Sequence, residues 1–123
     1  MNEIPLFSSL SIKSITLRNR VVLSPMCQYK AKDGMINDWH LQHYSRFAFS
    51  GLGAAFIEAT GVSPEGRIGH GCTGIWSDDH IEGLSKIAKT FKKYNCVSGI
   101  QLAHAGRKAS FLRPWDGASP ITK

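Results

Sequence analysis

One stretch of this sequence gathers several side chains that could do chemistry. It follows the apolar run 20–23 and supplies a hydroxyl, a proline ring, a thioether, a thiol and a phenol, in the order Ser24, Pro25, Met26, Cys27 and Tyr29. We interpret the apolar run as a short buried strand. Parallel sheets bind ligands at the carboxyl ends of their strands. A proline, a sulfur and a phenol at such an end therefore indicate a wall that faces a cofactor.

Two further strand ends carry groups suited to binding. Glu58 and Ala59 close the apolar segment 54–59. Glu58 alone is compatible with a general base or with a satisfied charge inside a protein core, whereas Ala59 offers only its backbone groups. Gln101 interrupts the apolar segment 96–102, and an amide buried there needs a partner because it both donates and accepts hydrogen bonds. That partner is a cofactor, a neighbouring side chain or a buried water.

The histidines and cysteines do not form a recognisable metal site. His40 and His43 share one face of a predicted helix, but the sequence offers no acidic or cysteine partner, so we expect a polar surface role for them. The cysteines Cys27, Cys72 and Cys96 are widely spaced and contain no Cys-x-x-Cys pair. Neither a zinc site nor a disulfide framework is predicted, and reduced thiols fit a cytoplasmic protein better.

Alternating strands and helices must position these groups. The hydrophobic pattern predicts a hairpin over 10–17, strands over 21–26, 54–59 and 96–102, and helices that begin near Asn37 and Ser77. Leu41, Tyr44, Phe47 and Ala48 share one side of the first helix, and Ile81, Leu84, Ala88 and Phe91 form the stripe of the second. Strands joined by helices imply right-handed crossovers and a parallel sheet. A doubly wound sheet is the competing architecture, but no glycine-rich dinucleotide or phosphate motif follows any strand.

The motifs resemble those of a known family. The segment 17–29 is similar to the first barrel strand of the Old Yellow Enzyme family, and the pair Cys27 and Tyr29 resembles its bacterial subclass of xenobiotic reductases and small NADPH dehydrogenases. The segment 100–107 resembles the family's third strand with its loop, and 74–81 resembles the entry to its second helix. These motifs occur in the family's order, so the resemblance covers the chain from Leu6 to about Trp115.

The resemblance implies an FMN-dependent oxidoreductase of the ene-reductase type. NADPH or NADH would reduce FMN, and the reduced flavin would pass hydride to the β-carbon of a small enone-type substrate. Tyr29 would face the substrate, and the Cys27 thiol would tune the flavin without acting as a nucleophile. The residues expected to line FMN are Ser24, Pro25, Met26, Cys27, Ala59 and Gln101.

Length limits this interpretation. The chain has 123 residues, whereas an eight-stranded (β/α)8 barrel needs about 250. We therefore predict an α/β fold in which residues 1–123 form the N-terminal part of such a barrel, truncated on its C-terminal side, with a hairpin and about three β/α units. The family's later histidine pair, flavin arginine and phosphate loops are absent from this sequence.

Two alternatives to this assignment follow. Open sheet edges predict self-association or pairing with a complementary C-terminal half, and the chain could act through that association alone, without catalysis. A different flavin barrel, such as a dienoyl-CoA reductase, would share these strands but requires further domains.

The composition argues against a membrane or a nucleic acid as the partner. Residues of hydrophobic type make up 42% of the chain, no apolar run approaches the ~20 residues of a membrane span, and no signal peptide is evident, so we expect a cytoplasmic protein without membrane contact. The net charge of +6 is partly explained by lysines in the second half of the second helix, where they complement the helix dipole. No aromatic residues interleave with them, and nucleic-acid binding is not predicted.

Overall fold

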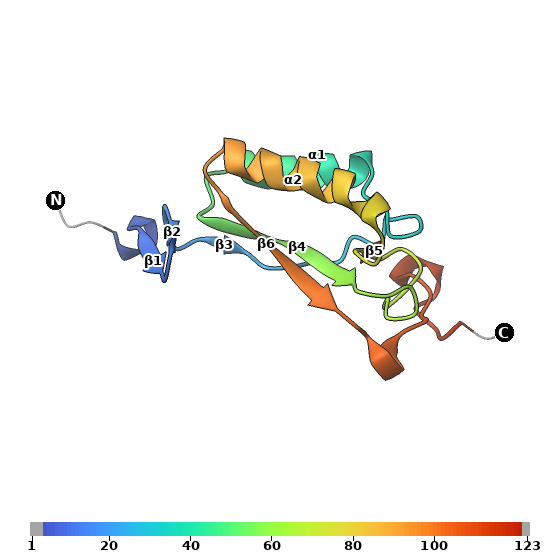
Figure 1. The fold of residues 1–123 in the computed structure, drawn as a ribbon. Helices are drawn as coiled ribbons and strands as arrows, with labels where there is room; N and C mark the ends of the chain where they lie inside the picture. Colours follow the sequence, from blue (N-terminus) through green and yellow to red (C-terminus); the bar gives the residue numbers. More distant parts are fainter. Residues whose placement is uncertain (1–3, 122–123) are drawn as a thin grey trace.

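A computed structural model describes residues 4–121 of the chain. An N-terminal hairpin leads into a parallel sheet, two helices lie together on one side of this sheet, and an irregular segment ends the described chain (Figure 1). The hairpin consists of β1 (Leu10–Ile12) and β2 (Ile15–Leu17), which pair antiparallel. The hairpin predicted over 10–17 is therefore confirmed.

Three strands of the sheet, β3, β4 and β6, lie side by side in the order in which they occur along the chain. β4 (Ala54–Gly61) pairs in parallel with β3 (Val22–Leu23) on one side and with β6 (Val97–Ala103) on the other. A fourth strand, β5 (Thr73–Gly74), pairs with the end of β4 and was not predicted, because it lies within a long glycine-rich loop. The predicted parallel sheet is confirmed.

The first predicted strand is shorter than expected. Of residues 21–26, only Val22 and Leu23 form a ladder with β4. Pro25 has no backbone N–H to contribute to a ladder, and further along β4 the pairing partner is β5, not the segment after β3. Residues 24–26 therefore continue from the strand without being part of the sheet.

Both helices begin with the same arrangement of side chains. Asn37 caps α1 (Asp38–Phe49), and its backbone N–H donates to Nδ1 of His40, at 3.2 Å. Ser77 caps the 3₁₀ turn Asp78–His80 that precedes α2 (Ile81–Lys93), and its N–H donates to Nδ1 of His80, also at 3.2 Å. Each cap satisfies backbone groups that the first turn of a helix would otherwise leave unpaired.

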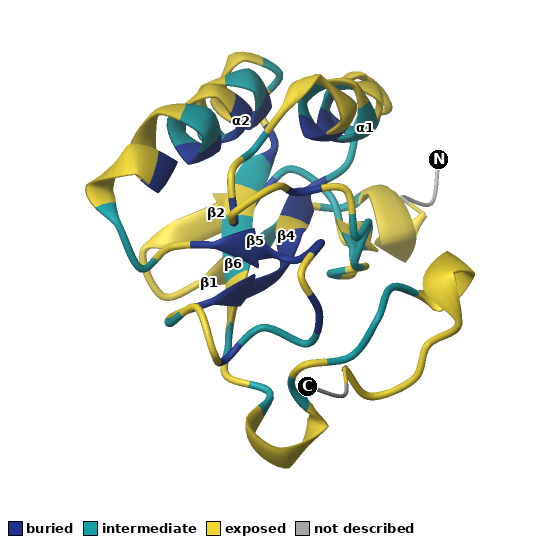
Figure 2. Cartoon of the chain, turned by 90° about the vertical axis from the view of Figure 1, so that its right-hand side faces the viewer, coloured by how far each residue is buried: buried dark blue, intermediate teal, exposed yellow. Residues whose placement is uncertain are grey.

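The core lies between these helices and the sheet. Its buried members are Tyr44, Ala48, Ala55, Ile57, Leu84, Ile87, Phe91 and Cys96. Figure 2 shows that the buried positions of α1 and α2 lie on the sides turned towards the strands. The stripe predicted for α2 is correct for Leu84 and Phe91, but Ile87 is buried and Ile81 is 54% exposed.

The arrangement distinguishes between the two predicted architectures. A doubly wound sheet carries helices on both faces, whereas a barrel winds its strands in chain order and covers only the outer face with helices. Here β3, β4 and β6 are in chain order and both helices cover one face (Figure 1). The opposite face exposes Val22 and Phe56, with 44% and 39% of each residue accessible. This face corresponds to the inside of a barrel.

We expect Phe91→Ala to reduce the free energy of unfolding by about 3–5 kcal/mol, because its fully buried ring packs between α2 and the sheet. Phe7→Ala, at a residue that is 61% exposed, is the matched control and should change it by well under about 1 kcal/mol. Urea titration followed by circular dichroism measures both. Equal effects of the two substitutions would contradict this description of the core.

Candidate functional site

An irregularity in β4 forms the centre of the candidate site. The pairing of β4 with β6 shifts between Ile57 and Thr60, so that Glu58 and Ala59 together lie opposite the single residue Gln101. This is a β-bulge, which reorients side chains and often lies next to active sites. As a result the usual alternation fails, and all residues of 57–61 are buried. The bulge sets two of the predicted flavin-lining residues, Ala59 and Gln101, on neighbouring strands.

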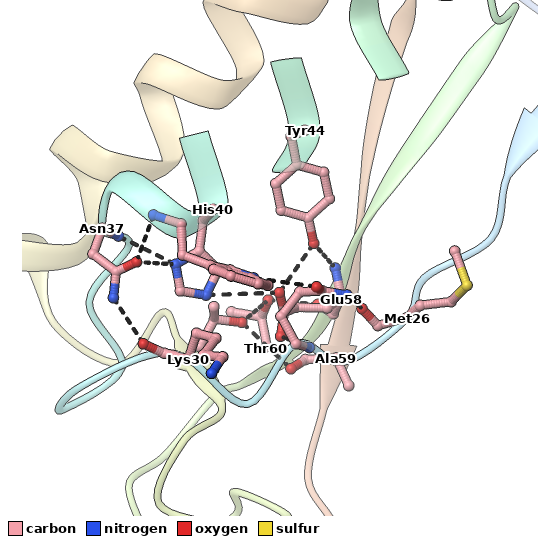
Figure 3. Close-up of polar contacts among 11 residues, drawn as sticks. Met26, Lys30, Asn37, His40, Tyr44, Glu58, Ala59 and Thr60 are labelled. Carbon is pink, nitrogen blue, oxygen red and sulfur yellow. Dashed lines mark hydrogen bonds and ion pairs between the residues drawn. The ribbon is translucent and has the colours of Figure 1, made fainter. Parts of the chain in front are cut away.

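The segment after β3 reaches the same bulge. The backbone N–H of Gln28 donates to Oε2 of Glu58 at 2.8 Å, and the backbone of Ala59 hydrogen-bonds the thiol of Cys27. Figure 3 shows the chain at Met26 passing beside Glu58 and Ala59. The structure therefore brings together the three separate parts of the sequence in which flavin-lining residues were predicted.

The predicted residues differ in how far they are accessible. Ser24, Met26 and Gln101 are exposed, Pro25 and Cys27 are half-buried, and Ala59 is buried. The Ala59 carbonyl also accepts a long hydrogen bond from the Thr73 hydroxyl, at 3.4 Å.

The thiol of Cys27 is held in its neutral form. A hydrogen bond with the neighbouring Cys72 thiol, followed by burial, raises the pKa of Cys27 well above its ordinary value. A neutral thiol is a poor nucleophile, which agrees with the expectation that Cys27 does not attack substrate.

Tyr29 has an unusual backbone conformation. Its φ angle is +53°, in the left-handed region that residues other than glycine rarely adopt. Its ring packs edge-on against Trp115, with the ring centroids 6.2 Å apart. Burial raises the pKa of the Tyr29 phenol, so the group is a neutral hydrogen-bond donor near pH 7.

Glu58 is fully buried on the helix side of the sheet, where Tyr44 and His40 meet it. The Tyr44 hydroxyl donates to Oε1 of Glu58 at 3.2 Å and accepts the Glu58 backbone N–H at 2.8 Å. Nε2 of His40 lies 3.8 Å from the same Oε1 (Figure 3). Burial raises the pKa of Glu58 to about 7. Of the two settings left open by the sequence, the structure places Glu58 inside the core, where burial leaves the carboxyl group partly protonated near pH 7.

The expected surface role of His40 is wrong, because its ring is completely buried beneath α1. Its Nδ1 lies within hydrogen-bond distance of both the N–H and the Oδ1 of Asn37, and its Nε2 faces Glu58 without a hydrogen bond. Burial lowers the pKa of His40 to about 4 and keeps the ring neutral. No group of three or more potential metal ligands occurs within residues 4–121.

Sequence reasoning missed His40 and Tyr44 as parts of this cluster. A usable signal was present, since Asn37 and His40 have the same spacing as Ser77 and His80, and a side chain at the third helical position can close a capping box. That spacing predicts a histidine turned back towards the end of a strand. It does not reveal which carboxylate the histidine meets.

The exposed groups at the bulge suit a flavin ring. Within the described chain, the structure records no hydrogen bond from the Gln101 amide, which can both donate to and accept from the polar edge of a ring. Pro25 and Met26, which follow β3 on the other side of β4, supply apolar groups. By contrast, a hollow of about 940 Å³ is lined by the carboxylates of Asp33, Asp78, Asp79 and Glu82 with Arg67 as its one cation, and this excess of negative charge suits a phosphate poorly.

Residues 5–121 match the family described as NADH:flavin oxidoreductase / NADH oxidase, and the chain belongs to this family. It is 48% identical to an NADPH dehydrogenase of Geobacillus thermodenitrificans, over all of this chain but 39% of that protein. It is also 48% identical to an NADPH dehydrogenase of Bacillus subtilis, over 85% of this chain and 31% of that protein. The chain thus spans about a third of the length of these relatives.

Solved structures of the family have the same fold over this region. The Old Yellow Enzyme of Pichia sp. AKU4542 superposes with a TM-score of 0.79 at 27% identity, covering 86% of this chain and 28% of that one. The old yellow enzyme of Trypanosoma cruzi gives a TM-score of 0.77 at 32% identity, covering 85% and 28%. The predicted fold class, the N-terminal part of a (β/α)8 barrel, is confirmed. FMN and a reduced nicotinamide, the predicted cofactors, are those of the family.

Neither α1 nor α2 has the length and apolar character needed to cross a bilayer.

The raised pKa of Glu58 predicts how stability depends on pH. Between pH 4.5 and about 7 the folded chain holds a proton on Glu58 that the unfolded chain has released, so this residue lowers stability as pH rises. His40, whose pKa is lowered, acts in the opposite sense between about 4 and 6.5. The effect of Glu58 is therefore isolated by comparison with Glu58→Gln, which keeps His40.

Relative to Glu58→Gln, the wild-type free energy of unfolding should fall by roughly 3 kcal/mol from pH 4.5 to pH 8. Denaturant titrations at several pH values measure this difference. A difference that stays constant with pH would show that Glu58 has an ordinary pKa.

Proposed function

We propose that the chain supplies the first three β/α units, and part of the flavin-binding wall, of an FMN-dependent NAD(P)H oxidoreductase of the ene-reductase type. The observation that carries the proposal is the convergence of residues 24–29, Ala59 and Gln101 at the bulge of β4. These parts are up to 77 positions apart along the chain, from 24 to 101. Their meeting at the carboxyl ends of parallel strands fits the place where barrels bind substrates.

Each residue has a role in this proposal. The Gln101 amide binds the polar edge of the flavin, and Ser24 binds through its backbone. Pro25, Met26 and Cys27 pack against the ring, and the small Ala59 side chain lets the ring approach β4. When bound, FMN supplies the hydride transfer from reduced nicotinamide to an activated C=C bond. Tyr29 donates a hydrogen bond to the oxygen of a small enone-type substrate.

The names of the relatives support NADPH as the reductant, since the chain is 46–48% identical to several bacterial proteins called NADPH dehydrogenase. A cytoplasmic location fits the three cysteines, which are all free thiols in the structure. We include both in the proposal.

A second candidate function is association without catalysis. The sheet face opposite the helices exposes the large apolar side chains of Val22 and Phe56. Exposed apolar faces of this kind mark interaction surfaces. In this case the chain would bind a complementary C-terminal half, or a second copy of itself, through the face that a whole barrel encloses.

Replacement of Gln101 by Leu tests the cofactor assignment. Loss of the amide should weaken FMN binding roughly tenfold or more, because the polar edge of the ring loses its hydrogen bonds. Gln42→Leu, at an exposed position on α1, is the matched control and should leave affinity unchanged. Quenching of flavin fluorescence on titration measures both. Equal affinities for the two variants would remove Gln101 from the site.

Co-production with the missing part of a relative separates the two candidate functions. We would express the chain together with the remaining C-terminal portion of the Geobacillus thermodenitrificans NADPH dehydrogenase. Copurified FMN and NADPH oxidation in the presence of an enone support the oxidoreductase. A stable complex that binds no flavin supports association alone.

A further inference from the structure

The segment 27–29, which carries the Cys27 thiol and the Tyr29 phenol, is held against β4 by the carboxylate of Glu58. The Gln28 N–H donates to Oε2 of Glu58 at 2.8 Å, and the backbone N–H of Tyr29 also hydrogen-bonds this carboxylate. Cys27 comes immediately before these two donors. One buried side chain therefore sets the path of the backbone between the two functional groups.

This path is not one that the segment would adopt unaided. Tyr29 has a left-handed backbone with φ of +53°, which is unfavourable for a residue with a large side chain. A conformation of this kind persists only when the surrounding structure fixes it. The consecutive N–H groups of Gln28 and Tyr29 turn around the Glu58 carboxylate, which provides that constraint.

The carboxylate is itself held from the opposite side. Tyr44 donates to its Oε1 at 3.2 Å, and the neutral His40 ring presents Nε2 to the same oxygen at 3.8 Å. Both residues belong to α1, whose position depends on the core. Within the described part of the chain, no lysine or arginine forms an ion pair with Glu58.

We propose that Glu58 is a positioning residue, whose carboxylate transmits the fixed position of α1 to the backbone of 27–29 and so orients the Cys27 thiol and the Tyr29 phenol. The inference rests on the proposed function, which assigns those two groups to flavin and substrate. Glu58 itself touches neither. Its side chain acts on the helix side of the sheet, and its effect reaches the site through the Gln28 and Tyr29 amides.

The groups around Glu58 make this positioning depend on pH. It is faced by His40 and Tyr44 from α1 and by Cys27 and Tyr29 from the segment after β3, and these four are neutral near pH 7. The Cys72 thiol also interacts with Glu58, and its hydrogen bond with Cys27 lowers the pKa of Cys72 to about 7, so Glu58→Gln separates the titration of Glu58 from that of Cys72. Burial raises the pKa of Glu58 to about 7. Protonation removes the charge that the two backbone N–H groups stabilise, so their hydrogen bonds weaken as pH falls below 7.

Nuclear magnetic resonance of the ¹⁵N-labelled full chain tests the inference without any flavin. In the wild type, the amide signals of Gln28 and Tyr29 should move together with pH, with a midpoint at about 7. Glu58→Gln should abolish this titration, because the amide side chain carries no charge. Glu82→Gln, at an exposed carboxylate on α2, is the matched control and should leave it intact. Titration that persists in Glu58→Gln would overturn the inference.

A second variant keeps the inference testable if Glu58→Gln does not fold. Tyr44→Phe removes one hydrogen bond to the ionised carboxylate, and the Gln28 and Tyr29 amides should then titrate with a higher midpoint. Tyr94→Phe, at the end of α2, is its control and should leave the midpoint unchanged. An unchanged midpoint in Tyr44→Phe would contradict the proposed link to α1.

The same titration with FMN bound shows whether the protonation of Glu58 reaches the flavin site. A purely structural role of Glu58 would not affect this measurement. In the wild type with FMN, the visible absorbance of the flavin should change with the same midpoint as the two amides, and Glu58→Gln should lose this change. A flavin spectrum that titrates unchanged in Glu58→Gln would refute transmission to the site. Absence of FMN binding would instead count against the proposed function, and the amide titration would still decide the role of Glu58.

Discussion

A carboxylate buried without a cationic partner is the constraint around which this part of the barrel is built. Removing the Glu58 charge from water is costly unless hydrogen bonds compensate it. The compensation comes from α1 through Tyr44 and from the backbone at Gln28, while Nε2 of His40 lies 3.8 Å from the carboxylate without a hydrogen bond. The bulge in β4 makes this possible, because it turns Glu58 towards the helices where a regular strand would alternate. The same irregularity places Ala59 beside Gln101.

The two β/α units share one arrangement at the start of their helices. In each, a histidine at the start of the helix accepts the N–H of the capping residue through Nδ1. The other ring nitrogen then faces a group outside the helix: Nε2 of His80 lies 3.1 Å from the Asp33 carbonyl, and Nε2 of His40 faces Glu58. Each histidine thereby ties a helix start to a part of the chain that comes from another unit. The two helix starts are alike in structure, but in sequence they share only a capping residue followed three positions later by a histidine.

Much of the fold could be predicted from the residue pattern. The hairpin, the parallel order of three strands and the two capped helices follow from hydrophobic periodicity and from Asn37 and Ser77, and the motif around Cys27 identifies the family. The bulge could not be predicted, because an apolar run such as 54–59 looks the same whether or not one residue is extra. For the same reason Glu58 could be read as a base or as a satisfied charge, and His40 was assigned to the surface. Both depend on contacts between α1 and β4, which neither segment specifies alone.

The central claim is that residues 24–27, Ala59 and Gln101 form one flavin-binding surface at the bulge of β4. The most direct measurement is a map of backbone amide shifts in the labelled protein as FMN is added to saturation. The account predicts that the largest changes occur in 24–27, at Ala59 and at Gln101, on three separate strands or strand ends. Changes concentrated at the acidic hollow near Asp78, or no changes at these residues in a folded chain, would contradict it.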